Sequence, residues 1–326
     1  MLPFYNGTRL NLTMNAPKSA ITSGLCIVLL WVSLLAGQGA APAPPIQTNR
    51  SIRVDVDLVL VNVTVTDRYG RFVQGLSKEH FQVWEDKVEQ EIATFSGEDT
   101  PVSLGIILDR SGSMGVTKPR ATDSRSPSIL DEARSYAFEC LKDGIREDEY
   151  FLVEFSSKAQ VVADFTNDLS RLREKLLFVE AGGRTALWDA IYAGVAKSQD
   201  GMYTRKALLV LTDGLENNSR YTLFNLKEVL RERDVRIYGV NATPNVQFDG
   251  LAQLIELSGG RSFGSSNPCQ ELAADLKNQY VLGYRPTNRA SDGAFRKITV
   301  RLDPSSLPKG VSDLSVRARA GYYAAP

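Results

Sequence analysis

The stretch from residue 101 to residue 277 alternates short apolar runs with segments in which apolar residues recur every three or four positions. The run Ala207–Leu211 is continuously apolar, as expected of a strand that is covered on both faces. Leu130, Ala133 and Ala137 instead have the spacing that places side chains on one face of a helix. Alternating strands and helices are typical of a doubly wound, mostly parallel sheet. The sequence therefore predicts an α/β domain over residues 101–277.

The same two patterns predict the individual elements of this domain. Strands are expected at residues 103–108, 149–155, 160–165, 206–212, 235–240 and 260–264. Helices are expected at residues 128–143, 168–179, 186–199, 222–233, 248–258 and 268–277. Open α/β sheets bind ligands at the carboxyl ends of their strands. The residues that follow each strand are therefore candidate functional residues.

Two β-rich segments, residues 53–98 and 279–324, flank the α/β domain. Strands are expected at residues 53–66, 81–85, 89–95, 280–284, 295–302 and 314–323. Within residues 53–66 the apolar phase shifts by one residue between Leu58 and Val59, which indicates a bulge or a switch between sheets. Each segment is too small for a core of its own, whereas together they have the size of a β-sandwich. We therefore expect a small all-β sandwich built from both ends of the chain, with the α/β domain inserted in it.

Residues 1–41 have the pattern of a secretory signal peptide. Residues 21–35 are almost uniformly apolar, only basic charges precede them, and small residues and prolines follow. This apolar core is short for a membrane span, although an uncleaved N-terminal anchor stays open as the alternative. Residues 42–52 would be a linker. In both cases we expect the folded protein to be extracytoplasmic: secreted, periplasmic or tethered to the membrane by residues 21–35.

The charge balance and the single histidine exclude several classes of function. Lys plus Arg and Asp plus Glu both number 38, and a net charge of zero argues against a broad basic face for nucleic acid. One histidine is too few for a His-based zinc site, and Ser113 has no histidine within its own segment to act as a base. We interpret His80, in the segment Ser77–Phe81, as part of a capped helical turn at the surface. We therefore expect the protein not to be an enzyme.

The sequence contains three cysteines, of which Cys26 lies in the leader. Cys140 and Cys269 could pair in an oxidising compartment. Their separation in the sequence does not decide between a disulfide and two thiols, because pairing depends on geometry. We expect two separate buried thiols.

Three polar segments lie at the predicted carboxyl edge of the α/β sheet. Asp109, Ser111 and Ser113 follow the first strand, Thr185 follows a Gly-Gly-Arg loop before a helix, and Asp213 follows another buried strand. They offer three hydroxyls and two carboxylates, which are oxygen ligands of the kind that Mg²⁺ and similar cations prefer. The sequence therefore predicts a divalent-cation site at this edge.

These residues resemble the metal-ion-dependent adhesion site of von Willebrand factor A domains. All five positions are filled in the family's order: Asp-x-Ser-x-Ser, then a Thr, then Thr-Asp-Gly. The flanking β segments resemble bacterial VWFA-related proteins first grouped from Acidobacteria. The stretches that carry this likeness are Val56–Val59, Phe81–Asp86, Tyr280–Tyr284 and Arg317–Tyr322. The resemblance covers most of residues 50–325.

The resemblance implies a mode of binding. Ser111, Ser113 and Thr185 would contact the cation through their hydroxyls, whereas Asp109 and Asp213 would act mostly through water and hydrogen bonds. Mg²⁺ is the expected cation, with Mn²⁺ or Ca²⁺ as alternatives. One coordination position would stay open for an Asp or Glu of a partner protein. From the charge balance we expect no nucleic-acid partner, and from the leader we expect a membrane contact only through the possible N-terminal anchor.

Simpler interpretations of the same residues stay open. In one, Ser111 and Ser113 only cap a turn, and Asp213 only accepts backbone hydrogen bonds. In another, the protein is a structural component of an envelope assembly, and the metal only stabilises the fold. A phosphotransferase with Asp109 as nucleophile is disfavoured, because that chemistry needs a second carboxylate where Ser111 stands. The loop at residues 116–128 is expected to be a solvated insertion, or to help select the partner.

Overall fold

A computed structural model describes residues 58–97, 100–117, 126–143, 147–241, 249–264, 267–307 and 313–325. All of them belong to the second of the two units into which the chain divides, Val54–Pro326. The predicted leader (1–41), the linker (42–52) and most of the loop at 116–128 lie outside the described residues, so these interpretations stay predictions. Among the described residues, no helix is long and apolar enough to cross a membrane.

The central sheet has six strands in the order β10-β9-β8-β5-β6-β7. These strands are β5 (Val102–Asp109), β6 (Glu149–Phe155), β7 (Ala159–Thr166), β8 (Arg205–Thr212), β9 (Arg236–Asn241) and β10 (Ser262–Phe263). All neighbouring pairs are parallel except β6 and β7, which pair antiparallel. The doubly wound, mostly parallel sheet expected from the sequence is thus confirmed.

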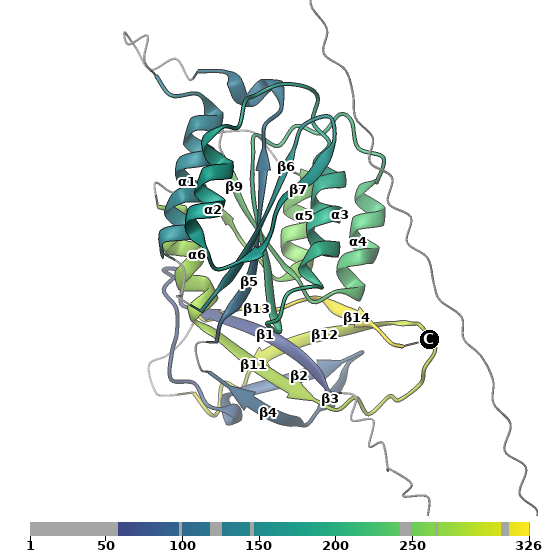
Figure 1. Cartoon of the computed structure of the whole chain (residues 1–326). Helices are drawn as coiled ribbons and strands as arrows, with labels where there is room; N and C mark the ends of the chain where they lie inside the picture. The colour runs from purple at the N-terminus through teal and green to yellow at the C-terminus, as the bar shows by residue number, and fades with distance from the viewer. Residues whose placement is uncertain are drawn as a thin grey trace, which may run out of the picture. The chain divides into compact units, whose positions relative to one another are not determined.

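Within the described part of the chain, six helices cover this sheet. They are α1 (Ile129–Asp143), α2 (Leu169–Leu177), α3 (Leu187–Ser198), α4 (Leu223–Glu232), α5 (Asp249–Ser258) and α6 (Pro268–Lys277). Figure 1 shows α1, α2 and α6 on one face of the sheet and α3, α4 and α5 on the other. Two separate apolar cores result, because side chains along β5 alternate between them: Ile106 and Leu108 pack in one core and Ile107 in the other.

The two β-rich segments form two four-stranded antiparallel sheets, β13-β1-β11-β4 and β14-β12-β2-β3. Their strands are β1 (Val59–Thr66), β2 (Phe81–Glu85), β3 (Val88–Gln90), β4 (Ile92–Ser96), β11 (Gln279–Tyr284), β12 (Phe295–Leu302), β13 (Ser315–Arg317) and β14 (Gly321–Tyr323). One apolar core joins both sheets and includes Val63 of β1, Val83 of β2 and Leu282 of β11. The sequence between β4 and β11 contains the whole α/β part, as expected of an inserted domain.

The prediction of one strand each for residues 89–95 and 314–323 is wrong, because each segment forms two strands. Residues 89–95 divide between β3 and β4, and residues 314–323 divide between β13 and β14; in each case the two strands belong to different sheets. In residues 314–323 the alternation of apolar residues continues across the crossing, because both sheets turn an apolar face toward the same core. Alternation therefore reveals the buried face of a strand but not the sheet to which it belongs. The expected phase shift at Leu58 falls partly outside the described residues, and β1 begins at Val59.

The expectation of two separate thiols is also wrong. Cys140 at the end of α1 and Cys269 at the start of α6 form a disulfide, with their Cα atoms 4.6 Å apart. The two residues are 129 positions apart in the sequence and meet because α1 and α6 pack side by side on one face of the sheet.

A buried polar network joins the sandwich to the α/β part. Arg236 of β9 donates to Thr64 Oγ1 of β1 at 3.0 Å, and Thr64 Oγ1 in turn donates to Asp275 of α6 at 3.0 Å. Arg317 of β13 forms an ion pair with Asp275 at 2.9 Å. Asp275 is fully buried and Arg236 nearly so, hence their charges depend on these partners.

Candidate metal centre

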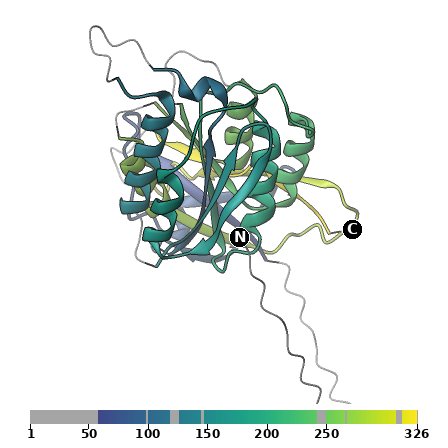
Figure 2. The same ribbon diagram turned by 45° about the horizontal axis from the view of Figure 1, so that its top comes forward.

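The carboxyl end of the central sheet holds the residues that the sequence selected. Asp109 is the last residue of β5, and Thr212 and Asp213 end the neighbouring strand β8 and begin its loop. Because β5 and β8 are parallel, both strands deliver these side chains to the same edge of the sheet. Figure 2 turns this edge toward the viewer.

The first loop is organised around Asp109. One carboxylate oxygen of Asp109 accepts a hydrogen bond from the Ser111 N–H at 2.8 Å, and the other accepts one from Thr212 Oγ1 at 2.6 Å. The hydroxyls of Ser111 and Ser113 lie 3.2 Å apart. Met114, fully buried in the turn that follows (η2, Gly112–Gly115), anchors this loop in the core. The two serine hydroxyls are thereby held next to each other above β5.

The second loop is fastened to the first by its backbone. Gly112 N–H donates to the Gly183 carbonyl at 2.9 Å, and Gly182 N–H donates to the Arg110 carbonyl at 2.8 Å. Gly183 has a φ of +86°, and a Cβ there would lie 2.8 Å from Ser157 Oγ, so this position requires glycine. Thr185 lies two residues after Gly183 and is almost fully buried.

The third loop, which follows β8, contains Asp213 and forms hydrogen bonds to Thr185 of the second loop. Asp213 Oδ1 accepts from the Leu215 N–H at 3.3 Å. The Thr185 N–H donates to Asn217 Oδ1 at 3.0 Å, while the Thr185 carbonyl accepts from the N–H groups of Asn217 and Asn218, both at 3.0 Å. The structure thus brings the five predicted residues to three mutually bonded loops at one edge of the sheet.

The electrostatics of the site suit a cation. Burial raises the pKa of Asp109 to about 6, and the negative charge of Asp213 adds a smaller increase, against hydrogen bonds from Thr212 and Ser111 that lower it. A nearby positive charge favours the ionised form of such a carboxyl group. The donors are hydroxyl and carboxylate oxygens, which fit Mg²⁺ or a similar divalent ion. The described residues contain no cluster of three or more His, Cys, Asp or Glu side chains arranged to hold a metal. The candidate metal centre instead combines the carboxylates of Asp109 and Asp213 with hydroxyl groups.

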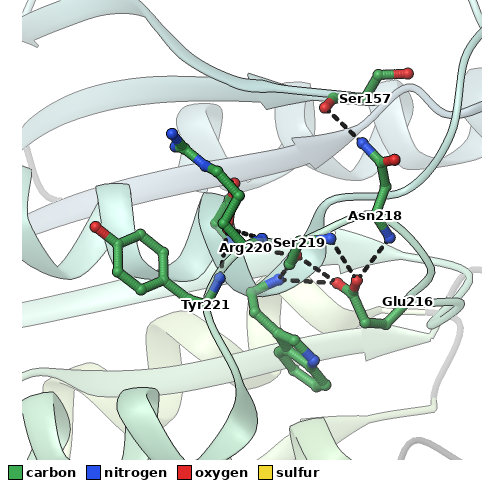
Figure 3. Close-up of polar contacts among 8 residues, drawn as sticks. Ser157, Glu216, Asn218, Ser219, Arg220 and Tyr221 are labelled. Atoms are coloured by element: carbon green, nitrogen blue, oxygen red, sulfur yellow. Dashed lines mark hydrogen bonds and ion pairs between the residues drawn. The ribbon is translucent and has the colours of Figure 1, made fainter.

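Sequence reasoning missed Glu216, which shapes the third loop. Its carboxylate accepts hydrogen bonds from the Asn218 N–H at 2.9 Å, the Ser219 N–H at 2.8 Å and Ser219 Oγ at 2.7 Å, and from the Trp188 N–H of α3 at 3.1 Å. Figure 3 shows Asn218 and Ser219 next to this carboxylate, with dashed lines for their hydrogen bonds to it. The signal in the sequence was an acidic residue just before an Asn-Asn-Ser run, a composition that favours tight turns.

Asp189, in the first turn of α3, was missed as well. It accepts from the N–H groups of Arg220 at 2.8 Å and Tyr221 at 3.1 Å, and from Arg220 Nε at 3.1 Å. Asn218 Nδ2 donates to the Ser157 carbonyl at 2.8 Å, which ties the same loop to the turn after β6 (Figure 3). The loop that carries Asp213 is therefore held from two sides.

Comparison with known proteins identifies the central domain. The model of the von Willebrand factor type A domain family matches residues 104–216, a range that includes all five predicted site residues. No curated protein matches the chain.

Several solved structures resemble part of the chain. An aerotolerance-related membrane protein from Bacteroides fragilis is 17% identical with a TM-score of 0.43, over 54% of this chain and 98% of that one. BatB from Bacteroides thetaiotaomicron is 19% identical with a TM-score of 0.42, over 54% and 96%. The vWF domain of the type V pili tip protein Mfa5 from Porphyromonas gingivalis is 19% identical with a TM-score of 0.31, over 36% and 38%. Residues 104–216 therefore lie in a von Willebrand factor type A domain, and the six-stranded, mostly parallel sheet has the fold expected of that domain.

Proposed function

We propose that this protein is an exported protein-binding module whose carboxyl-edge site holds a divalent cation, Mg²⁺ before Mn²⁺ or Ca²⁺, and captures an Asp or Glu of a partner protein. The observation that carries the proposal is the joining of three loops that place Asp109, Ser111, Ser113, Thr185 and Asp213 at one edge of the sheet. When bound, the cation supplies an open coordination position to an incoming carboxylate.

The bonding of the site supports direct contact by hydroxyls and indirect contact by Asp109. Both carboxylate oxygens of Asp109 already accept hydrogen bonds, from the Ser111 N–H and from Thr212 Oγ1. The hydroxyl oxygens of Ser111, Ser113 and Thr185 would be uncharged ligands of the cation. Few direct carboxylates leave a bound cation with more of its charge for a partner's carboxylate, which favours binding over catalysis.

The disulfide supports an extracytoplasmic location. Disulfides persist in oxidising compartments and are rare in the cytosol. The bond between Cys140 and Cys269 therefore agrees with the leader-like pattern of residues 1–41.

The buried carboxyl group of Asp109 favours a second candidate function, in which the cation has a structural role. A cation that only neutralises Asp109 and Asp213 would stabilise the fold without any partner, as in a structural component of an envelope assembly. The two candidates differ in what the site recognises. Only the first requires that a carboxylate outside the chain complete the site.

The test uses fluorescent peptides that carry one central Glu or, as the matched control, one central Gln. Binding is measured by fluorescence anisotropy in Mg²⁺ and in EDTA, with wild type, Asp213→Ala and the control Asp164→Ala, which removes an exposed carboxylate of β7. We expect Mg²⁺-dependent binding of the Glu peptide alone, lost in Asp213→Ala and kept in Asp164→Ala. Equal binding of both peptides, or none, together with a lower melting temperature in EDTA, would favour the structural candidate.

A further inference from the structure

Several exposed apolar side chains belong to segments at the edge of the sheet that bears the candidate metal centre. Nine large apolar side chains are exposed among the described residues, and five of them lie on loops or helix ends at the carboxyl edge of the sheet. We call these five the apolar rim; they and their exposed fractions are Val116 (56%), Leu177 (58%), Phe178 (81%), Leu215 (49%) and Phe224 (68%).

The directions of the strands show at which edge of the sheet Leu177 and Phe178 lie. β7 runs antiparallel to β6, so it ends at the opposite edge of the sheet from Asp109. The helix that follows, α2, must return to the site edge, because the chain then continues to Thr185. Leu177 and Phe178 end α2 and therefore lie at that edge, where the Leu177 carbonyl accepts a hydrogen bond from Arg134 of α1.

Of the other residues of the apolar rim, Val116 and Leu215 lie within three residues of a predicted metal ligand. The Val116 N–H donates to the Ser113 carbonyl, on the side of α1 and α2. The Leu215 N–H donates to Asp213 on the other side of β5. Phe224 lies in the first turn of α4, which begins where the third loop ends. The segments that bear exposed apolar side chains thus lie on both sides of the site.

We propose that the apolar rim selects partners in which the captured Asp or Glu is flanked by apolar residues. This inference rests on the proposed function and names the partner's chemistry. A single exposed apolar side chain is ordinary, whereas a cluster next to a polar site is typical of a protein interface. A few well-packed, fully desolvated side chains carry most of the binding energy of a protein interface. The rim therefore supplies the affinity and the selectivity that one carboxylate contact lacks.

The test compares labelled peptides that have one central Glu and either Leu and Phe or only Ser around it. Binding to the full chain is measured by anisotropy in Mg²⁺ and in EDTA. The variants are Phe178→Ser and Leu215→Ser, with Met202→Ser as the matched control. Met202 is 75% exposed but precedes β8, at the opposite edge of the sheet. Mg²⁺ affinity and the oligomeric state of each variant are measured by calorimetry and analytical ultracentrifugation.

We expect wild type and Met202→Ser to bind the apolar-flanked peptide about tenfold more tightly than the Ser-flanked one, and Phe178→Ser and Leu215→Ser to lose most of this difference. Mg²⁺ affinity should be equal in all four proteins. Equal, Mg²⁺-dependent binding of both peptides would overturn this inference and leave the proposed function standing. Absence of any Glu-dependent binding would overturn both. A dimer that Phe178→Ser dissociates would make the rim a self-interface and also contradict the inference.

Discussion

Asp109 is the most enclosed charged side chain of the candidate site. It has no solvent exposure, and burial raises its pKa to about 6. The native protein without metal therefore holds this proton more tightly than the unfolded chain does. The resulting stabilisation is complete below the ordinary pKa of Asp, near 4, and is lost as the pH rises through about 6.

We expect metal-free protein to lose about 3 kcal/mol of unfolding free energy from Asp109 between about pH 4 and pH 7.5. Urea unfolding in EDTA across this range measures the loss. Asp109→Asn, which does not titrate, should show a flatter profile than wild type. A variant profile as steep as that of wild type would mean that Asp109 is not the group responsible.

Glu216 positions the loop of the candidate metal centre, although it is not one of the proposed metal ligands. Its carboxylate fixes the loop that carries Asp213 and connects that loop to α3. We expect Glu216→Gln to weaken Mg²⁺ binding by about tenfold, because residues that orient ligands typically contribute a factor of this size. Calorimetry measures the change, and Glu180→Gln, an exposed neighbour of the site, is the control. An unchanged affinity in Glu216→Gln would show that the loop holds its shape without this carboxylate.

Single positions of the site were predictable to the extent that they follow a strand. Asp109 and Asp213 come directly after apolar runs, so the parallel sheet places them together. Glu216 and Asp189 were not predictable in the same way, because their role depends on which backbone N–H groups the folded loop turns toward them.

At the scale of elements, short runs rich in apolar and aromatic residues, whether continuous or alternating, determine their own strands. Residues 149–155 and 81–85 form strands with the bounds that the sequence predicts. Which elements pair with one another cannot be predicted from such runs. That residues 89–95 serve two sheets, and that α1 lies against α6, depends on contacts between segments distant in the sequence.

The bond between α1 and α6 should be a major source of stability. It closes a loop of 129 residues, and in the chain-entropy model removal of such a crosslink costs about 3–5 kcal/mol. We expect the double variant Cys140→Ala, Cys269→Ala to lose this amount in urea unfolding. Reduction of wild type should reproduce the loss and leave the double variant unchanged. A loss below about 1 kcal/mol would show that packing alone holds the two helices.

For the molecule as a whole, the sandwich and the α/β part depend on a shared buried network. Asp275 is paired with Arg317 and hydrogen-bonded by Thr64, to which Arg236 also donates. We expect Asp275→Ala to lower the unfolding free energy by about 3 kcal/mol, because it removes the buried carboxylate that pairs with Arg317 and accepts the hydrogen bond from Thr64. Asp303→Ala, at an exposed turn of the sandwich, is the control. A loss equal to that of the control would mean that the network adds no stability to the junction.

The central claim is that three loops of this molecule form one cation site. The most direct measurement is calorimetric titration of Mg²⁺ into metal-stripped full-length protein, with Asp213→Ala and Asp164→Ala in parallel. We predict saturable binding at one site in wild type and Asp164→Ala, and none in Asp213→Ala. Equal binding by Asp213→Ala would contradict the claim, because the cation would then lie elsewhere.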